Sequence, residues 1–232
     1  MVKMNNGAQP CYAVLTGDIV NSSSLREDRR LQLYREMQTL SNLLKQVFSQ
    51  QISHDLANFR GDGWQLLLDQ PQKALVVSIF IRTFFRYKFK AERLDSRVAV
   101  AIGPVDYVPE KNISEGFGPA FTESGLLLDR MKTERMQIAL VAATSSPREM
   151  TIVSLVRTFD DLISAWTAPQ CQAVHLALQG YTQKEIGERW EPRRIAQPSV
   201  AKHLKSAQWS FVKNGITLFD SILTSLLDSQ TW

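Results

Sequence analysis

Short apolar runs alternate with longer stretches in which apolar residues recur every three or four positions, which predicts strands mixed with helices. The short runs, each bounded by turn residues, predict strands at residues 11–16, 56–59, 64–68, 97–103 and 136–142. The longer stretches predict helices at residues 25–50, at residues 119–131 and after Pro71. This order of elements predicts an α+β fold with a mainly antiparallel sheet and helices on one face, close to the split βαβ arrangement.

The segment 59–69 is the most informative of these stretches. Gly61 and Gly63 flank Asp62 between two apolar runs, which predicts a hairpin with Asp62 at its tip. Aspartate and glycine are common turn residues, so the turn by itself favours an ordinary loop by about two to one. A carboxylate held in a tight turn is nevertheless well placed to bind a hard cation.

A second aspartate, Asp18, makes a metal site more plausible than an ordinary loop. Asp18 follows the first predicted strand, and it meets Asp62 if that strand lies beside the hairpin. The two carboxylates and the carbonyl oxygen of Ile19 then form the set of hard oxygen ligands that Mg²⁺ or Mn²⁺ prefers. The sequence therefore predicts a metal site at this end of the sheet.

Composition and charge bound the function only loosely. The chain has 232 residues and a formal net charge of +4, which permits a nucleic-acid partner without requiring one. Its two cysteines indicate neither a disulfide framework nor a zinc site. We expect a cytoplasmic protein with no membrane partner, because neither a signal peptide nor an apolar run of about 18 residues is present. The helix after Pro71 carries a basic run, for which a solvated helix end is expected over a binding surface: Arg82, Arg86, Lys88, Lys90 and Arg93.

The composition shifts after Ala143, and a helix predicted from Pro147 marks a domain junction. We expect a first domain at 1–146, a connecting helix at 147–165 and a helical domain at 166–232. In the helical domain, Thr167 can cap one helix, and Thr182 has the spacing of a capping box with Glu185. A third helix begins near Pro198, and Gly187 would let two helices cross closely. An apolar stripe after Trp209 either closes this unit or pairs two chains.

Three short motifs carry a resemblance over about residues 11–142. In their order and spacing, Gly17–Ser22, Gly61–Gln65 and Gly118–Phe121 resemble the SatD family of bacterial proteins and the class III nucleotidyl cyclase domain. The resemblance implies a ferredoxin-like fold with metal-binding aspartates at Asp18 and Asp62. It also implies nucleotide contacts from Asn21, Ser22, Arg60, Gly61 and Gly63.

Three positions depart from the cyclase pattern. Thr122 and Leu126 stand where the cyclases carry an asparagine and an arginine, and Asn58 stands in place of the purine-selecting lysine. Leu126 cannot stabilise developing phosphate charge. The resemblance therefore favours binding of a metal or nucleotide over catalytic turnover.

Residues 164–209 resemble the helix-turn-helix of sigma-factor region 4 and of many bacterial regulators, and the SatD family has such a tail. In such units the third helix enters the major groove of DNA. The expected base or phosphate contacts are Gln197, Ser199, Lys202 and His203, with further phosphate contacts from Lys184, Arg193, Arg194 and Lys205. The turn at Glu191–Ala196 is about three residues longer than usual, which displaces the third helix or adds a basic arm.

These observations favour a DNA-binding transcriptional regulator, acting as a homodimer, whose first domain binds a nucleotide and a divalent metal. The first alternative is an enzyme that makes a cyclic or linear nucleotide, with Asp18 and Asp62 holding two metals. The second alternative is an adaptor whose first domain has lost its ligands.

Overall fold

The computed structural model describes residues 10–59, 61–141 and 145–229, and it contains one five-stranded sheet. The strands are β1 (Cys11–Val20), β2 (Ala57–Phe59), β3 (Gly63–Leu68), β4 (Asp95–Pro104) and β5 (Met136–Leu140). They lie in the order β2-β3-β1-β4-β5, and neighbours are antiparallel except for the parallel pair β4 and β5. The predicted α+β class, the mainly antiparallel sheet and the hairpin are thus confirmed.

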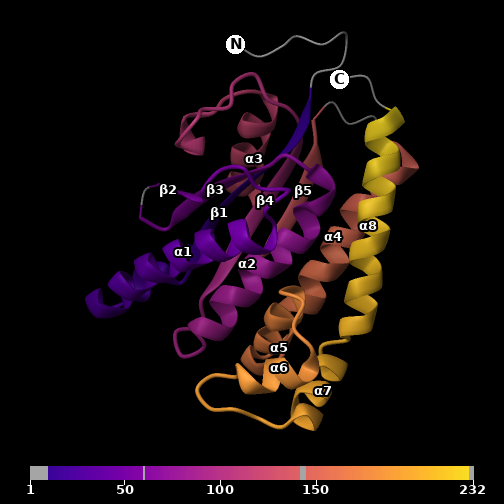
Figure 1. Ribbon diagram of the computed structural model, residues 1–232. Helices are drawn as coiled ribbons and strands as arrows, with labels where there is room; N and C mark the ends of the chain where they lie inside the picture. Colours follow the sequence, from indigo (N-terminus) through magenta and orange to yellow (C-terminus); the bar gives the residue numbers. More distant parts are fainter. Residues whose placement is uncertain (1–9, 60, 142–144, 230–232) are drawn as a thin grey trace.

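Helices cover both faces of this sheet (Figure 1). The helices are α1 (Glu27–Val47), α2 (Ala74–Lys88), α3 (Pro119–Arg130), α4 (Pro147–Ser164), α5 (Ala168–Leu178), α6 (Gln183–Glu188), α7 (Gln197–Ser206) and α8 (Trp209–Ser229). The prediction of helices on one face was wrong, because side chains on both faces of β1 are buried. Leu15 packs into the main core with α1 and α2, whereas its neighbour Val14 packs with Phe121 of α3 on the opposite face.

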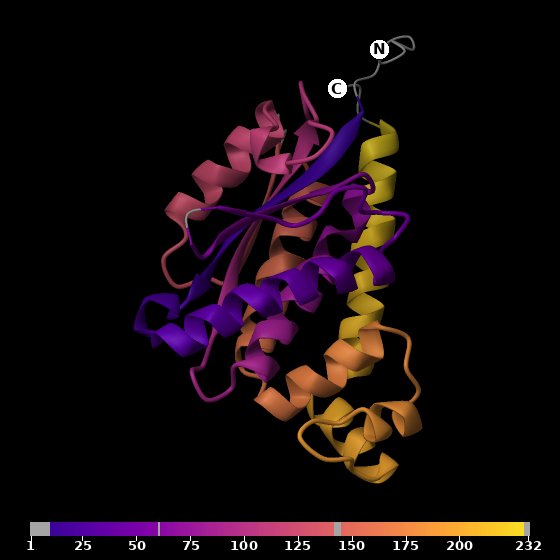
Figure 2. The ribbon, with the colours of Figure 1, turned by 60° about the vertical axis from the view of Figure 1, so that its left-hand side comes forward.

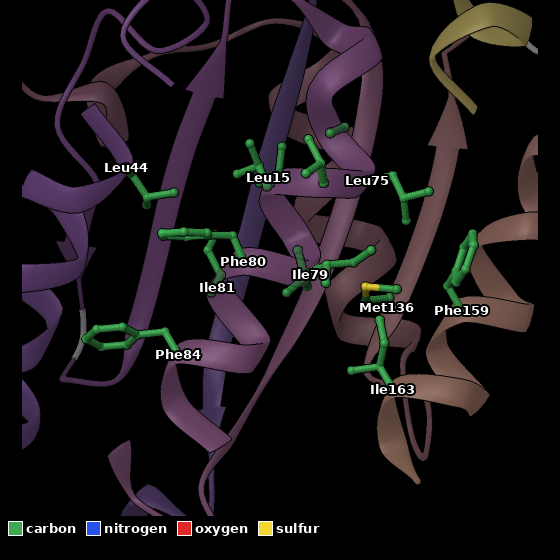
Figure 3. Packing of buried hydrophobic residues seen from close by; sticks show 14 of the residues in the cluster. Leu15, Leu44, Leu75, Ile79, Phe80, Ile81, Phe84, Met136, Phe159 and Ile163 are labelled. Carbon is green, nitrogen blue, oxygen red and sulfur yellow. The ribbon is translucent and has the colours of Figure 1, made fainter. Parts of the chain in front are cut away.

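Helix α2 lies at the centre of the molecule and is buried on all sides along most of its length (Figure 3). Every residue from Ala74 to Phe85 is buried, because α2 packs against the sheet, α1, α5 and α8. Arg82 has no exposed surface and donates hydrogen bonds to Asp95 and Asp160. The expectation of a solvated basic helix end was therefore wrong for Arg82, because burial among carboxylates replaces water as its partner.

The helices after β5 continue the core of the sheet. One hydrophobic cluster joins residues of the sheet and of α2 to residues of α4, α5 and α8. In Figure 2, α5, α6 and α7 gather at one end of the molecule while α8 runs back along α4. Phe219, Leu223 and Leu226 of α8 are buried in that cluster, so the C-terminal stripe packs within its own chain. The domain boundaries and the pairing of two chains stay predictions.

No helix within the described ranges combines the length and the apolar character that crossing a bilayer requires.

Candidate functional site

Asp18 lies inside β1 and not after it, because β1 continues to Val20. Gly17 makes this continuation possible, since a β-carbon there would lie 2.3 Å from the indole ring of Trp64. The Trp64 Nε1 group donates to the Ser96 hydroxyl at 2.9 Å, and that hydroxyl donates to the Asp18 carbonyl oxygen at 2.9 Å. This buried chain of hydrogen bonds fixes the backbone at Asp18.

The sheet places Asp18 between two partners. Asp18 pairs with Gly63 on β3, directly after Asp62, and with Arg97 on β4. The predicted meeting of the first strand with the hairpin is therefore confirmed, and it brings the backbones of Asp18 and Asp62 to neighbouring positions.

Arg97 is the site residue that sequence reasoning missed. Its Nε donates to Asp18 Oδ1 at 2.9 Å, and its second terminal nitrogen donates to Asp18 Oδ2. The remaining terminal nitrogen donates to the carbonyl oxygen of Met131 at 2.8 Å. The hydrogen bond from Arg97 to Asp18 is the main reason why the pKa of Arg97 is raised. The sequence places a basic residue at the start of the strand at 97–103, which indicates that some acidic partner is possible. Only the register between β1 and β4 identifies Asp18 as that partner.

Asp62 and the residues around it have their own contacts. The Ser22 hydroxyl donates to Asp62 Oδ2, and the Asn21 side chain donates to the Arg93 carbonyl oxygen at 3.2 Å. Gly61 has a positive φ of 87°, which a residue with a side chain adopts only under strain. A side chain on Gly63 would meet the Phe59 carbonyl oxygen at 2.9 Å. The predicted nucleotide contact Arg60 lies outside the described residues.

These contacts decide how well the site suits a metal. Both carboxylate oxygens of Asp18 accept hydrogen bonds from Arg97, and one carboxylate oxygen of Asp62 accepts a hydrogen bond from Ser22. The Ile19 side chain is a hydrocarbon, so Ile19 can offer only its backbone carbonyl oxygen. Across the described ranges, His, Cys, Asp and Glu form no group of three that could hold a metal ion. As arranged, a metal ion at Asp18 would have to displace Arg97 from both carboxylate oxygens.

The helical part carries the second predicted site. The structure forms both predicted caps, with Thr167 and Gln170 closing one capping box and Thr182 and Glu185 closing another. Gly187 is buried, and a β-carbon there would lie 2.4 Å from the Ile195 carbonyl oxygen. Gly187 therefore admits the turn before α7, and α7 itself packs on α6 there, with a Val200 methyl group 3.6 Å from the position of that β-carbon.

Most of the predicted DNA contacts lie on the surface of α6, the turn and α7. The exposed members are Lys184, Arg193, Arg194, Gln197, Ser199, Lys202 and Lys205. The Gln197 side chain donates to the Gln183 side chain at 3.2 Å. His203 is half-buried and stacks on Trp190, with ring centroids 5.3 Å apart. Burial and the charge of Lys202 lower the pKa of His203 below its usual value.

The basic residues of this surface differ from three cations of the first unit. Arg82, Arg97 and Lys73 each form an ion pair with a carboxylate. The five basic residues predicted to contact DNA, namely Lys184, Arg193, Arg194, Lys202 and Lys205, form no ion pair with any residue that the structure describes. Positive charge on this surface is thus open to an external anion.

Comparison with known proteins identifies no family. No protein family profile matches the chain. A protein of Synechocystis sp. described as a putative carboxypeptidase is 33% identical over 76 residues, which make up 31% of this chain and 25% of that protein. The match thus covers a quarter of the relative, whose description says nothing of the remaining two thirds of this chain.

Proposed function

We propose that this protein binds double-stranded DNA through the helix-turn-helix formed by α6 and α7. The observation that carries the proposal is the set of five exposed basic residues on α6, on the turn and on α7 that form no ion pair with a described residue. Residues 182–209 contain six Lys and Arg residues against three Glu residues. A surface with this excess of unpaired cations gains affinity for DNA by releasing the counterions condensed on the phosphates.

The arrangement of α7 supports the same proposal. Val200 and Leu204 face the core, so the remaining surface of α7 is free to enter a groove. The first turn of α7 exposes Gln197 and Ser199, whose side chains have the hydrogen-bonding groups that contact base edges. Lys202 follows one turn later at an exposed position. The N-terminal half of α7 thus contacts the base edges in the groove, and the arginines of the turn position α7 by binding phosphates.

For the first unit we propose a ferredoxin-like, cyclase-related domain that serves regulation and not turnover. The strand order β2-β3-β1-β4, with α1 after β1 and α2 after β3, is the support for this fold. Two observations argue against turnover. Arg97 neutralises Asp18, and Leu126 stands on α3 with 44% of its surface exposed and no charge to offer a phosphate.

Binding of a nucleotide with Mg²⁺ or Mn²⁺ at this unit is the second candidate. It is favoured by the position of Asp62 next to Gly63, the residue that pairs with Asp18. A thermal-shift series with nucleoside triphosphates, with and without Mn²⁺, tests it because a ligand of the native state raises its stability. If this candidate holds, Arg97→Ala strengthens the metal-dependent shift by freeing Asp18. A shift that is absent in both proteins contradicts it.

The DNA proposal is tested by fluorescence anisotropy of a labelled duplex. We expect Lys202→Ala with Lys205→Ala to weaken binding by about tenfold or more, since each phosphate contact contributes through counterion release. Arg193→Ala with Arg194→Ala should weaken it similarly.

A matched control removes the same charge elsewhere. The double variant Lys111→Ala with Lys132→Ala changes two exposed lysines outside α6 and α7. It should bind as the unaltered protein does. Equal losses in the test and control variants would show that net charge alone attracts DNA, and the proposal would then fail.

A further inference from the structure

A pocket lies between the end of α2, the start of α5 and the turn that precedes α7. Its volume is about 450 Å³, which is within the range of small-molecule sites. Its walls include two aromatic residues, Tyr87 and Trp190, and two prolines, Pro169 and Pro192. Two lysines, Gln172 and Glu191 supply its polar groups. Mostly apolar walls with a few polar groups are typical of sites for small organic ligands.

The pocket contains a polar side chain, that of Gln172, which is free to contact a ligand. The Gln172 carboxamide makes no hydrogen bond with any residue in the described ranges, and its polar atoms are not fully enclosed by the protein, so they are accessible to a ligand. Such a group is a candidate for a ligand contact, because it both donates and accepts hydrogen bonds.

Charge at the pocket favours an anion. Lys88 and Lys90 both line it, whereas Glu191 is the one acidic residue among the lining residues. Lys88 donates to both Glu191 carboxylate oxygens, at 3.1 and 2.9 Å, while Lys90 is exposed and forms no ion pair with a described residue. One lysine is thus already neutralised and the other is free for a ligand.

We propose that this pocket binds a small aromatic acid, with its ring between the side chains of Tyr87 and Trp190 and its anionic group at Lys90. The acidic group is a carboxylate or a phosphate, since either suits a lysine. Gln172 donates to it or to a polar substituent of the ring. Neither the Asp18 region nor the exposed basic residues of α6 and α7 contribute to this pocket.

The position of the pocket gives the ligand a route to α7. Trp190 forms one wall of the pocket, and its ring stacks on His203 of α7. A ligand anion also competes with Glu191 for Lys88, and this ion pair joins the turn to α2. If α7 binds DNA as proposed above, the acid alters the affinity for DNA by shifting Trp190 and the turn.

The first experiment measures binding without DNA, so it does not depend on the proposed DNA function. Saturation-transfer NMR is recorded for benzoate and phenyl phosphate, with benzyl alcohol as the neutral probe of similar shape. We expect one or both acids to bind with a Kd below about 1 mM, and benzyl alcohol to bind at least about tenfold more weakly. The two acids distinguish a carboxylate site from a phosphate site.

Two variants test the placement. Gln172→Leu removes the unpartnered carboxamide with a side chain that a buried position tolerates, and Lys90→Ala removes an exposed charge. Each should weaken acid binding about fivefold or more, whereas Lys132→Ala, at an exposed position outside the pocket, should leave it unchanged. Acids that do not bind at about 10 mM, or that bind both variants as well as the unaltered protein, would overturn the site.

A second measurement separates the site from its coupling to DNA. The acid that binds is added at saturation to the anisotropy assay. A change in DNA affinity of about fivefold or more supports the coupling. An unchanged affinity overturns the coupling and leaves the site itself supported by the DNA-free measurement.

Discussion

The substitution Arg82→Met tests whether a buried ion network holds the helical part to the sheet. Arg82 has no exposed surface, and it lies between Asp95 at the start of β4 and Asp160 on α4. Its donor distances are 3.1 and 2.7 Å to the two Asp95 oxygens and 2.7 Å to Asp160 Oδ1. Methionine retains most of the volume and removes the charge, so the effect reports on the ion pairs.

The expected magnitude follows from what the variant leaves behind. Asp95 Oδ2 still accepts a hydrogen bond from the Arg86 side chain at 2.8 Å, and Asp160 Oδ2 still accepts one from the backbone N–H of Arg135 at 2.8 Å. One buried positive charge is nevertheless lost from between two buried carboxylates. Removing one partner of a buried ion pair costs about 3–5 kcal/mol, and we expect a loss of this size in the free energy of unfolding.

Urea denaturation followed by circular dichroism measures this loss. The double variant Arg82→Met with Asp160→Asn should lose about 1–3 kcal/mol less than the sum of the two single variants, because the two residues interact directly. Burial acts to raise the pKa of Asp95, but Arg82 and Arg86 outweigh it and hold the pKa below its usual value. The unaltered protein should therefore lose stability as the pH falls below about 4, and the variant should lose less. A loss below about 1 kcal/mol in Arg82→Met would refute the reasoning.

Three further substitutions test other contacts. Gly17→Ala should destabilise the protein by about 1–3 kcal/mol, because the new methyl group lies 2.3 Å from the Trp64 ring; urea denaturation measures this. Gly187→Ala places a methyl group 2.4 Å from the Ile195 carbonyl oxygen, so it should weaken DNA binding in the anisotropy assay by moving the turn, and unchanged affinity would contradict this. Burial lowers the pKa of His175 to about 3. Below about pH 6.5 the unfolded state therefore binds one more proton than the folded state, and the free energy of unfolding falls by about 1.4 kcal/mol for each pH unit that the pH is lowered. In His175→Phe that dependence should be weaker by about 1.4 kcal/mol per pH unit in unfolding curves recorded between about pH 4 and 6, while His203 still contributes.

The strands and helices were predictable because local signals mark them. Gly61 and Gly63 mark the hairpin turn, and Thr182 with Glu185 marks the start of α6; both depend on residues close together in the chain. The end of β1 was predicted too early, since Gly17 resembles a turn residue until Trp64 is known to pack on it. Local patterns therefore predict the presence and type of a strand or helix better than the residue at which it ends.

The contacts that define the sites were not predictable for a physical reason. The pair of Asp18 and Arg97 depends on the register between β1 and β4, which are 79 residues apart at these positions. The burial of Arg82 depends on Asp160, which is 78 residues away. Partners at such separations are set by packing, and the periodicity of either segment carries no information about them. In contrast, the exposed residues of α7 could be predicted because its amphipathic pattern fixes which side faces the core.

The salt dependence of DNA affinity tests the central claim most directly. The logarithm of the association constant for a labelled duplex is plotted against the logarithm of the salt concentration. Five phosphate contacts from Lys184, Arg193, Arg194, Lys202 and Lys205 predict a slope of about −4.5, and Lys202→Ala with Lys205→Ala should reduce its magnitude by about 2. A slope near zero, or a slope that the double variant leaves unchanged, would contradict the assignment of these residues to a DNA interface.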